Sequence, residues 1–367
     1  MTQTAERTNH LGSTIVSPGA WKGPEIDWTQ QGLHLLGAEQ LKEIDGALQH
    51  LLAQGDIDFP DITPQNFPLA SVGALMRSLP ERLRTGCGFL MLRGLPRSQY
   101  SDDDMARIYF GLGSYIGTPM TQSYLGDLLG HVVDVSDLDP KGRGYRKGGG
   151  QLMHTDSCDI IGLMCLRTAI SGGESRISSA LTVHNYLAEH HPEALDILRK
   201  GLFLKRTEED GRRATRTYSE RPVPFFTEHD GEITCYLPTG YARLAEKSGQ
   251  CPFSEAESNA LLLARKAAAS PEHYLDMGFK EGDIQFLNNR MMVHGRTDYQ
   301  DHKELADRRH LLRMWLRIGS WPRMPAEQVF HTDEDMRLWS MGRRRLMELP
   351  SNHDRDLLEG VASKMVD

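Results

Sequence analysis

Apolar residues recur every three or four positions in several stretches of this chain, a spacing typical of amphipathic helices. Two serines precede such stretches in capping-box patterns, Ser101 with Asp104 and Ser254 with Glu257, and therefore mark helix starts. Pro192 suits the start of a second helix within one stretch. The predicted helical stretches cover residues 37–52, 69–84, 101–115, 182–199 and 254–269.

Short apolar runs separated by turn residues dominate the remainder and predict strands. These runs cover residues 88–95, 131–135, 160–169, 175–181, 202–205, 223–226, 232–236, 284–287, 291–293 and 310–318. Many short strands with a few helices favour an α+β protein with a mainly β core, a sandwich or barrel with flanking helices. We divide the chain into an N-terminal arm and helix (1–60), a barrel domain with helical insertions (61–321) and a C-terminal helical extension (322–367).

Composition and charge limit the kinds of partner that the protein is expected to bind. The chain has 42 basic and 50 acidic residues, a net charge of −8 that argues against broad binding to nucleic acid or anionic membranes. Its start has no apolar signal segment, and no apolar run approaches the ~18 residues of a membrane span. Five cysteines cannot all pair within one chain, so we expect reduced thiols and a cytoplasmic protein. A homo-oligomer is compatible with the sequence.

Three side chains suggest a metal centre. His154 and Asp156 are two residues apart, so in an extended strand both project to the same face. His294 follows 294 − 154 = 140 residues later, at the end of another apolar run. Two imidazoles and one carboxylate form the facial triad of non-haem iron(II) oxygenases, which leaves positions open for other ligands. A structural zinc site usually has four ligands including thiolates, which makes zinc the weaker interpretation.

A cationic strand at residues 308–317 adds a second site. Arg309, Leu311 and Arg313 share one face of this strand, whereas His310 lies on the other, where packing or hydrogen bonding is its expected role. An arginine on the inner face of a barrel is costly to bury unless it meets an anion. The planar guanidinium matches a carboxylate with two hydrogen bonds, so a dicarboxylate cosubstrate is the natural partner.

Five motifs occur in an order that resembles the TauD/TfdA family of iron(II)- and 2-oxoglutarate-dependent dioxygenases. They are GFLMLRGL, MHTDSCD, SGGES, GDIQFLNNRMMVHGR and RRHLLRMWLR. The resemblance implies a double-stranded β-helix core, also called a jelly roll, with Fe(II) bound by His154, Asp156 and His294. It also implies that Arg309 binds the far carboxylate of 2-oxoglutarate and that Ser175 assists.

The same resemblance bears on the reaction. Arg313 falls where relatives contact the cosubstrate or an anionic substrate. Related halogenases replace the carboxylate ligand with Ala or Gly, so Asp156 favours hydroxylation or a related C–H oxidation. Expected partners are dioxygen and a small organic substrate, with no nucleic acid and no membrane.

A glycine-rich segment before the triad, residues 138–153, predicts a mobile lid over the substrate. Its positive charge is compatible with an anionic substrate, although a solvated basic loop is the commoner situation. The basic residues are Lys141, Arg143, Arg146 and Lys147. We expect Tyr124 and Tyr145 to contact the substrate.

Other interpretations remain open at this stage. The barrel could be a cupin-like protein that binds a metal or small ligand without turnover, and zinc-dependent hydrolysis lacks an obvious general base. Ser175 could be a strand hydroxyl that bonds a neighbour. The polar surroundings of His190, His191 and His273 predict surface positions.

Overall fold

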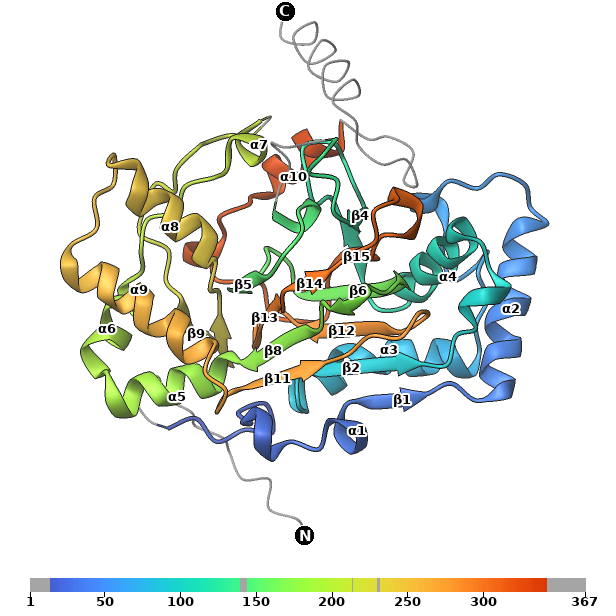
Figure 1. The fold of residues 1–367 in the computed structure, drawn as a ribbon, viewed down its shortest axis with the longest axis horizontal. Helices are drawn as coiled ribbons and strands as arrows, with labels where there is room; N and C mark the ends of the chain where they lie inside the picture. Colours follow the sequence, from blue (N-terminus) through green and yellow to red (C-terminus); the bar gives the residue numbers. More distant parts are fainter. Residues whose placement is uncertain (1–13, 139–143, 213, 230–231, 342–367) are drawn as a thin grey trace, which may run out of the picture.

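The computed structural model describes residues 14–138, 144–212, 214–229 and 232–341 (Figure 1). The larger of two main sheets contains β1 (Leu33–Leu35), β2 (Phe89–Arg93), β3 (Thr118–Met120), β4 (Leu129–Val132), β6 (Ile160–Arg167), β12 (Ile284–Asn288) and β15 (His310–Arg317). Their order is β1-β2-β12-β6-β15-β3, and β4 also pairs with β15. Only β1 and β2 pair in parallel; the other neighbours in this sheet are antiparallel.

The smaller main sheet is antiparallel. It contains β5 (Gln151–His154), β8 (Ser175–Ser179), β11 (Tyr274–Met277) and β13 (Met292–Arg296), in the order β11-β8-β13-β5. Two further two-stranded antiparallel sheets are β7 (Ser171–Gly172) with β14 (Tyr299–Gln300), and β9 (Phe226–His229) with β10 (Glu232–Cys235). Side chains from both main sheets line one pocket, so the sheets face each other across it.

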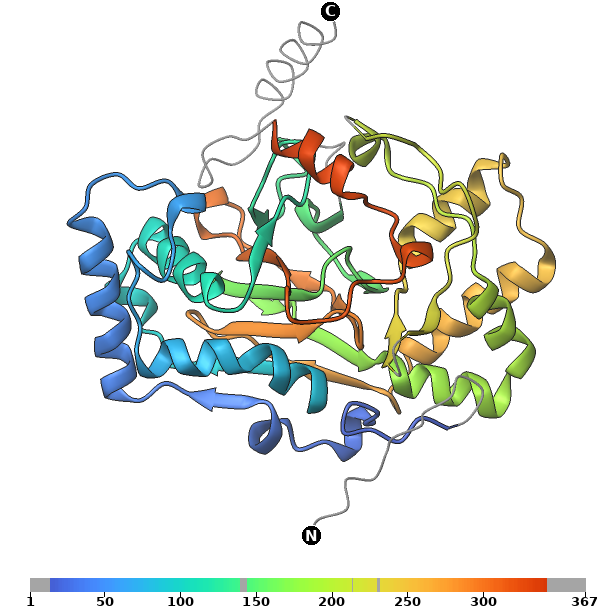
Figure 2. The same cartoon turned by 180° about the vertical axis from the view of Figure 1, so that it is seen from behind.

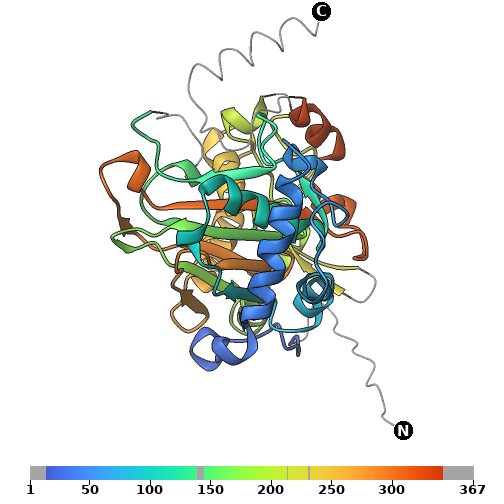
Figure 3. The same ribbon diagram turned by 90° about the vertical axis from the view of Figure 1, so that its right-hand side faces the viewer.

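Helices cover both sides of this β core. One group packs on the larger sheet, with α2 crossing in front of its strands in Figure 3 and α3 covering it in Figure 2. This group contains α2 (Ala38–Leu52), α3 (Ser71–Thr85) and α4 (Asp102–Ser114). A second group forms its own apolar core beyond the smaller sheet: α5 (Ala180–His190), α6 (Pro192–Lys200), α8 (Thr239–Ser248) and α9 (Glu255–Ala268).

Shorter helices complete the chain. They are α1 (Trp28–Gln31), α7 (Glu208–Gly211) and α10 (Asp333–Ser340), with 3₁₀ turns η1 (Gly23–Glu25), η2 (Phe59–Asp61), η3 (Arg97–Gln99), η4 (Gly144–Arg146), η5 (Leu305–Asp307) and η6 (Ala326–Gln328). After β15 the chain crosses towards α8, where Phe330 contacts Tyr241, and then turns back into α10 (Figure 2). No helix in the described part of the chain is long and apolar enough to cross a membrane.

The predicted elements are largely present. Every predicted helical stretch is helical, both capping boxes form, and the break before Pro192 separates α5 from α6. The α+β architecture with a β core is confirmed. The strand predicted at 202–205 is wrong, because this segment makes only isolated bridges at Leu202 and Lys205. The strand predicted at 223–226 is displaced, since β9 begins at Phe226.

Candidate metal centre and cosubstrate pocket

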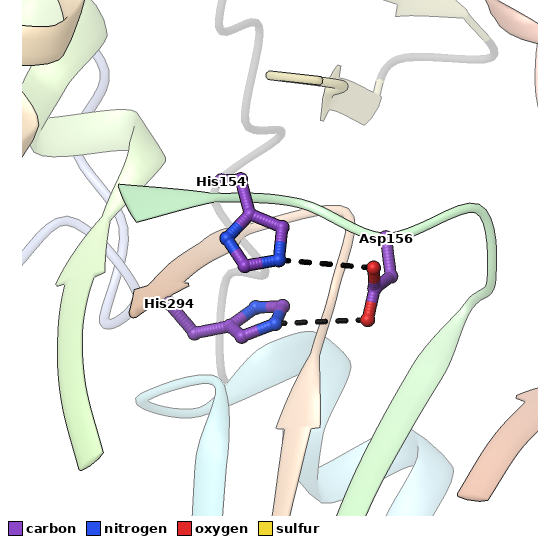
Figure 4. A group of neighbouring side chains, drawn as sticks. All are labelled: His154, Asp156 and His294. Carbon is purple, nitrogen blue, oxygen red and sulfur yellow. Dashed lines mark ion pairs between the residues drawn. The ribbon is translucent and has the colours of Figure 1, made fainter. Parts of the chain in front are cut away.

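The register of two neighbouring strands brings the histidines together. β5 and β13 pair antiparallel with His154 directly opposite His294, and the two ring centroids are 4.5 Å apart. Asp156 lies just beyond the end of β5, and its carboxylate faces both rings (Figure 4). His154 Nε2 is 3.8 Å from Asp156 Oδ1, and His294 Nε2 is 3.7 Å from Oδ2. One candidate ligand atom from each residue lies within 4.8 Å of the others, so the three side chains can hold one ion.

The protonation states suit metal binding. His154 Nδ1 lies 2.8 Å from the carbonyl of Leu152, to which it donates, so Nε2 is left with its lone pair facing Asp156. Burial and the neighbouring His294 lower the pKa of His154 to about 4, so the imidazole is neutral near pH 7. Burial alone would raise the pKa of Asp156, but Arg313 and the two histidines hold it well below its usual range. The set is therefore two neutral imidazoles and one carboxylate, the donor set that iron(II) accepts.

Strand β15 orients the carboxylate of Asp156. Trp315 Nε1 donates to Asp156 Oδ2 at 3.0 Å, and Arg313 Nη1 donates to the same oxygen at 3.2 Å. Both donors are buried. Because they bond Oδ2, the other oxygen, Oδ1, is left to turn towards an ion.

The turn between β12 and β13 fixes the backbone around Asp156. Asn289 Oδ1 accepts from the Asp156 amide at 2.9 Å, and Asn289 Nδ2 donates to the carbonyls of Asp156 at 2.6 Å and Cys158 at 2.8 Å. Beside it, Arg290 forms a buried ion pair with Asp159 at 2.6 Å. Sequence reasoning assigned no role to this turn, although the polar Asn-Asn-Arg run before an apolar strand was a signal.

Asn289→Ala should weaken iron binding about 10- to 100-fold, the usual cost of losing a partner that orients a metal ligand. The substitution removes three hydrogen bonds around Asp156 and leaves all three candidate ligands in place. Fe(II) affinity measured by anaerobic titration tests this. Asn66→Ala is the control, because that side chain also bonds backbone groups, of Asp61 and Thr63, but far along the chain from the site. Equal iron affinities in the two variants would contradict the assignment.

A pocket opens beside the triad. Its lining includes both candidate histidine ligands and all three residues predicted to bind a cosubstrate. The lining residues that matter here are Tyr145, Gln151, His154, Ser175, His294, Arg296, Arg309 and Arg313.

Arg309 is the best candidate for a carboxylate anchor. Its Nη2 donates to the carbonyl of Gly173 at 2.9 Å, whereas its buried Nη1 has no partner in the described part of the protein. Burial and the nearby Arg296 lower the pKa of Arg309 to about 10, so the side chain is still charged near pH 7. A buried guanidinium N–H without an acceptor is unfavourable by about 1–3 kcal/mol or more, so this position fits a ligand carboxylate oxygen.

Ser175 lies in the same pocket with a partner of its own. Its hydroxyl is buried and donates to Gln285 Oε1 at 2.8 Å. The structure thus shows the hydrogen bond to a neighbour that the sequence left open, in a position next to the proposed cosubstrate.

Arg313 is more fully engaged than Arg309. Its Nε donates to Gln122 Oε1 at 2.7 Å, its Nη1 bonds Asp156, and its buried Nη2 has no partner among the described residues. The guanidinium lies over the rings of Tyr145 and Trp315, at 4.4 and 5.0 Å from their centroids. Arg313 therefore links the candidate metal ligand Asp156 to the pocket wall.

The two tyrosines predicted to contact the substrate lie in different places. Tyr145 lines the pocket, on η4. Tyr124 does not line it: the residue is buried in another cluster with Leu125 and Trp339, and its hydroxyl is 3.3 Å from Arg212 Nη1. Of the basic residues in the glycine-rich segment, Lys141 and Arg143 lie outside the described residues.

A buried histidine pair lies behind β15. His310 Nδ1 accepts from Arg167 Nη2 at 2.9 Å, so its Nε2 carries the hydrogen and donates to His131 Nδ1 at 2.8 Å. This confirms the predicted hydrogen-bonding role of His310. Burial, His131 and Arg167 hold the pKa of His310 well below its usual value, because a proton there would face other donors.

This pair predicts acid sensitivity. An unfolded histidine takes up a proton near pH 6.5, whereas folded His310 does not, so the unfolded state binds more protons and stability falls as the pH drops. Below about pH 6.5, His310 should lower the free energy of unfolding by up to about 1.4 kcal/mol for each unit by which the pH falls. Urea unfolding between pH 7.5 and 5.5 should show a shallower pH dependence for His310→Gln than for the unsubstituted protein. Parallel curves would show that His310 does not contribute.

Comparisons with known proteins agree with this site. Residues 54–315 match the family described as taurine catabolism dioxygenase TauD, TfdA family. FR-33289 synthase of Streptomyces rubellomurinus is 27% identical over 336 residues, covering 88% of this chain and 95% of that protein. The taurine hydroxylase-like protein SAT17 of Stachybotrys chartarum is 29% identical over 314 residues, covering 80% of this chain and 77% of that protein.

Solved structures share the fold. Asparagine oxygenase with Fe(II), 3-hydroxyasparagine and succinate has a TM-score of 0.60 at 16% identity, over 78% of this chain and 93% of that one. The non-haem iron oxygenase OrfP with Fe and α-ketoglutaric acid has a TM-score of 0.58 at 15% identity, over 78% and 94%. The two facing sheets are thus the predicted double-stranded β-helix. The family match covers most of the sequence, and the His-Asp-His site is in place. The chain therefore belongs to the taurine catabolism dioxygenase TauD, TfdA family and is a non-haem iron dioxygenase that uses iron and 2-oxoglutarate.

Proposed function

We propose that the enzyme oxidises a C–H bond of a small anionic molecule, with iron bound by His154, Asp156 and His294 and 2-oxoglutarate bound by Arg309. When bound, iron and 2-oxoglutarate supply the activation of dioxygen that this oxidation needs. One observation carries the proposal: both histidine ligands and Arg309 line a single pocket, Asp156 lies beside the two histidines, and Arg309 Nη1 has no partner among the described residues.

The charge in the pocket supports anionic ligands. Three buried arginines, Arg296, Arg309 and Arg313, line or face it, whereas Asp156 is the carboxylate paired with one of them. A dianionic cosubstrate offsets much of this charge, and an anionic substrate would offset more. Arg309 is the proposed anchor, because no carboxylate among the described residues pairs with it, while Arg313 already bonds Asp156.

The remaining residues have supporting roles in this proposal. Ser175 lies beside the cosubstrate and can accept or donate a hydrogen bond by rotation of its hydroxyl. Arg313 offers Nη2, which has no partner within the described ranges, to an anionic group of the cosubstrate or substrate. Tyr145, stacked on Arg313, is the proposed substrate contact; the buried position of Tyr124 outside the pocket does not support the same role for that residue.

Relatives suggest which substrates to try first. Asparagine oxygenase and OrfP are known in complex with hydroxylated asparagine and arginine, and SAT17 is described as taurine hydroxylase-like. Amino acids, sulfonates and small carboxylic acids therefore form the first panel.

The test is a two-step titration. Under anaerobic conditions, adding Fe(II) and then 2-oxoglutarate should produce the visible charge-transfer band of the chelate. Oxygen and the substrate panel are then added, and succinate release is measured; a substrate should raise it above the uncoupled rate. A folded protein that gives no band would refute the proposal, and a band without any succinate would favour a binding protein that does not turn over.

A further inference from the structure

A segment of the glycine-rich stretch is tied to the strand that bears His294. Arg296, two residues after that ligand, donates from Nε to the carbonyl of Gly149 at 2.9 Å and from Nη2 to the carbonyl of Lys147 at 2.9 Å. Asp298 Oδ1 accepts from the amide of Gly150 at 2.6 Å. These three hydrogen bonds attach residues 144–150 to the end of β13.

The same arginine is connected to the proposed cosubstrate anchor. The ring of Tyr299 lies 4.9 Å from the guanidinium carbon of Arg296 and 5.5 Å from that of Arg309. Both arginines are buried and line the pocket, and neither has a carboxylate partner among the described residues. Two buried cations that share one aromatic ring repel each other until an anion arrives.

The attached segment also contributes a residue to the pocket wall. It carries Tyr145, whose ring lies 4.4 Å from the guanidinium carbon of Arg313. Contacts thus run from Arg309 through Tyr299 and Arg296 to the segment, and from the segment through Tyr145 to Arg313 beside the metal ligand Asp156.

We propose that Arg296 is a positioning residue that couples 2-oxoglutarate binding to the attachment of residues 144–150. This inference rests on the proposed binding of 2-oxoglutarate at Arg309. The carboxylate offsets the repulsion between Arg309 and Arg296, which leaves Arg296 better able to hold the segment. The attached segment in turn keeps Tyr145 over the pocket and excludes water from the bound anion. Because coupling between two sites is reciprocal, a loosened segment must weaken 2-oxoglutarate binding.

Limited trypsin digestion measures the attachment, because Arg146 and Lys147 lie within the segment. In the unsubstituted protein with Fe(II) and no oxygen, 2-oxoglutarate should slow cleavage after these two residues about five- to tenfold, as identified by mass spectrometry. In Arg296→Gln the segment should be cut readily and the cosubstrate should give no protection. Arg176→Gln is the control, because Arg176 also stacks on a tyrosine and bonds a neighbouring strand, but lies outside the pocket.

Substitutions of Asp298 distinguish coupling through the segment from a direct electrostatic effect on 2-oxoglutarate binding. Its side chain is exposed, so substitution there spares the core, and it does not line the pocket. Removing a negative charge near two arginines should by itself tighten 2-oxoglutarate binding or leave it unchanged. The coupling predicts the opposite for Asp298→Ala, about fivefold weaker binding measured by the charge-transfer band. Asp298→Asn, which loses the same charge but keeps an acceptor for Gly150, should stay close to the unsubstituted protein.

The outcomes distinguish this inference from the function on which it rests. No charge-transfer band in the unsubstituted protein would refute 2-oxoglutarate binding itself. A normal band, with Asp298→Ala cut faster but binding 2-oxoglutarate as tightly as Asp298→Asn, would overturn the coupling alone. Arg296→Lys serves if Arg296→Gln does not fold: it keeps the charge but not the two-carbonyl geometry, and it should also lose protection.

Discussion

His294→Ala will lower 2-oxoglutarate turnover by at least about 100-fold in a protein that remains folded. A residue that merely orients a metal ligand accounts for about 10- to 100-fold in metal affinity, so losing one of three direct ligands should exceed that range. The two remaining candidates, His154 and Asp156, would hold an ion from one side only, because β13 supplies no other donor at that position. The charge-transfer band with Fe(II) and 2-oxoglutarate should be lost along with succinate formation.

The matched control is His273→Ala. His273 is also buried, and it bonds the carbonyl of Ala267 at 2.7 Å, well away from the triad, so its loss leaves a comparable void without touching the metal. Circular dichroism and thermal unfolding of both variants show whether they fold. If His294→Ala releases succinate at a rate near that of the control, iron is not bound where we propose.

The spacing along the sequence was sufficient to pair two of the three candidate metal ligands, for a geometrical reason. Two residues at i and i+2 on an extended segment share a face whatever the tertiary fold, so His154 and Asp156 could be paired from spacing alone. The partner of His154 across the sheet could not: the register that places His294 opposite it depends on how β13 pairs with both β5 and β8. For His294, the prediction came from the ordered motifs of the family and not from residue spacing.

The predictions that the structure does not support have physical explanations as well. Leu202, Leu204, Val223 and Phe225 are buried in the apolar core that α5, α6 and α9 share, but they lie outside the strands, and only Phe226 enters β9. In these runs the apolar residues indicated burial rather than strand pairing. His273 has polar sequence neighbours and is nevertheless 3% exposed, because a backbone carbonyl satisfies its ring. Tyr124 and Tyr145 looked equivalent in sequence, and only the tertiary structure places one in the pocket and the other under Trp339.

Arg296 shows a signal that the sequence did contain. It lies two residues after His294 on the same strand, so the i and i+2 rule that paired His154 with Asp156 also directs Arg296 towards the pocket. The sequence-based prediction gives a role to the histidine of this strand and none to the arginine. Applying the rule to every charged residue near a candidate ligand would have included it.

Arg309→Gln should raise the KM for 2-oxoglutarate by about 30-fold or more. Truncating one partner of a buried, hydrogen-bonded charge pair typically costs about 2–5 kcal/mol, and the buried Nη1 that would meet the carboxylate is lost with the guanidinium. Glutamine is shorter and uncharged, so it restores neither the charge nor the paired donors. At saturating 2-oxoglutarate the rate should recover substantially, because the metal ligands are not altered.

Comparison with Arg313→Gln shows which of the two arginines binds the carboxylate of 2-oxoglutarate. Arg313 is occupied by Gln122 and Asp156, so its loss should disturb the metal ligand more than the cosubstrate: Fe(II) affinity should fall, with a smaller rise in the KM for 2-oxoglutarate than in Arg309→Gln. Arg309→Lys adds a second test, because lysine keeps the charge but not the fork and should fall between the unsubstituted protein and Arg309→Gln. The reverse ranking, with Arg313→Gln showing the larger rise in KM, would make Arg313 the carboxylate anchor. Arg309 would then be a buried cation whose Nη1 needs a different acceptor. The two variants therefore decide which guanidinium binds the carboxylate of the cosubstrate.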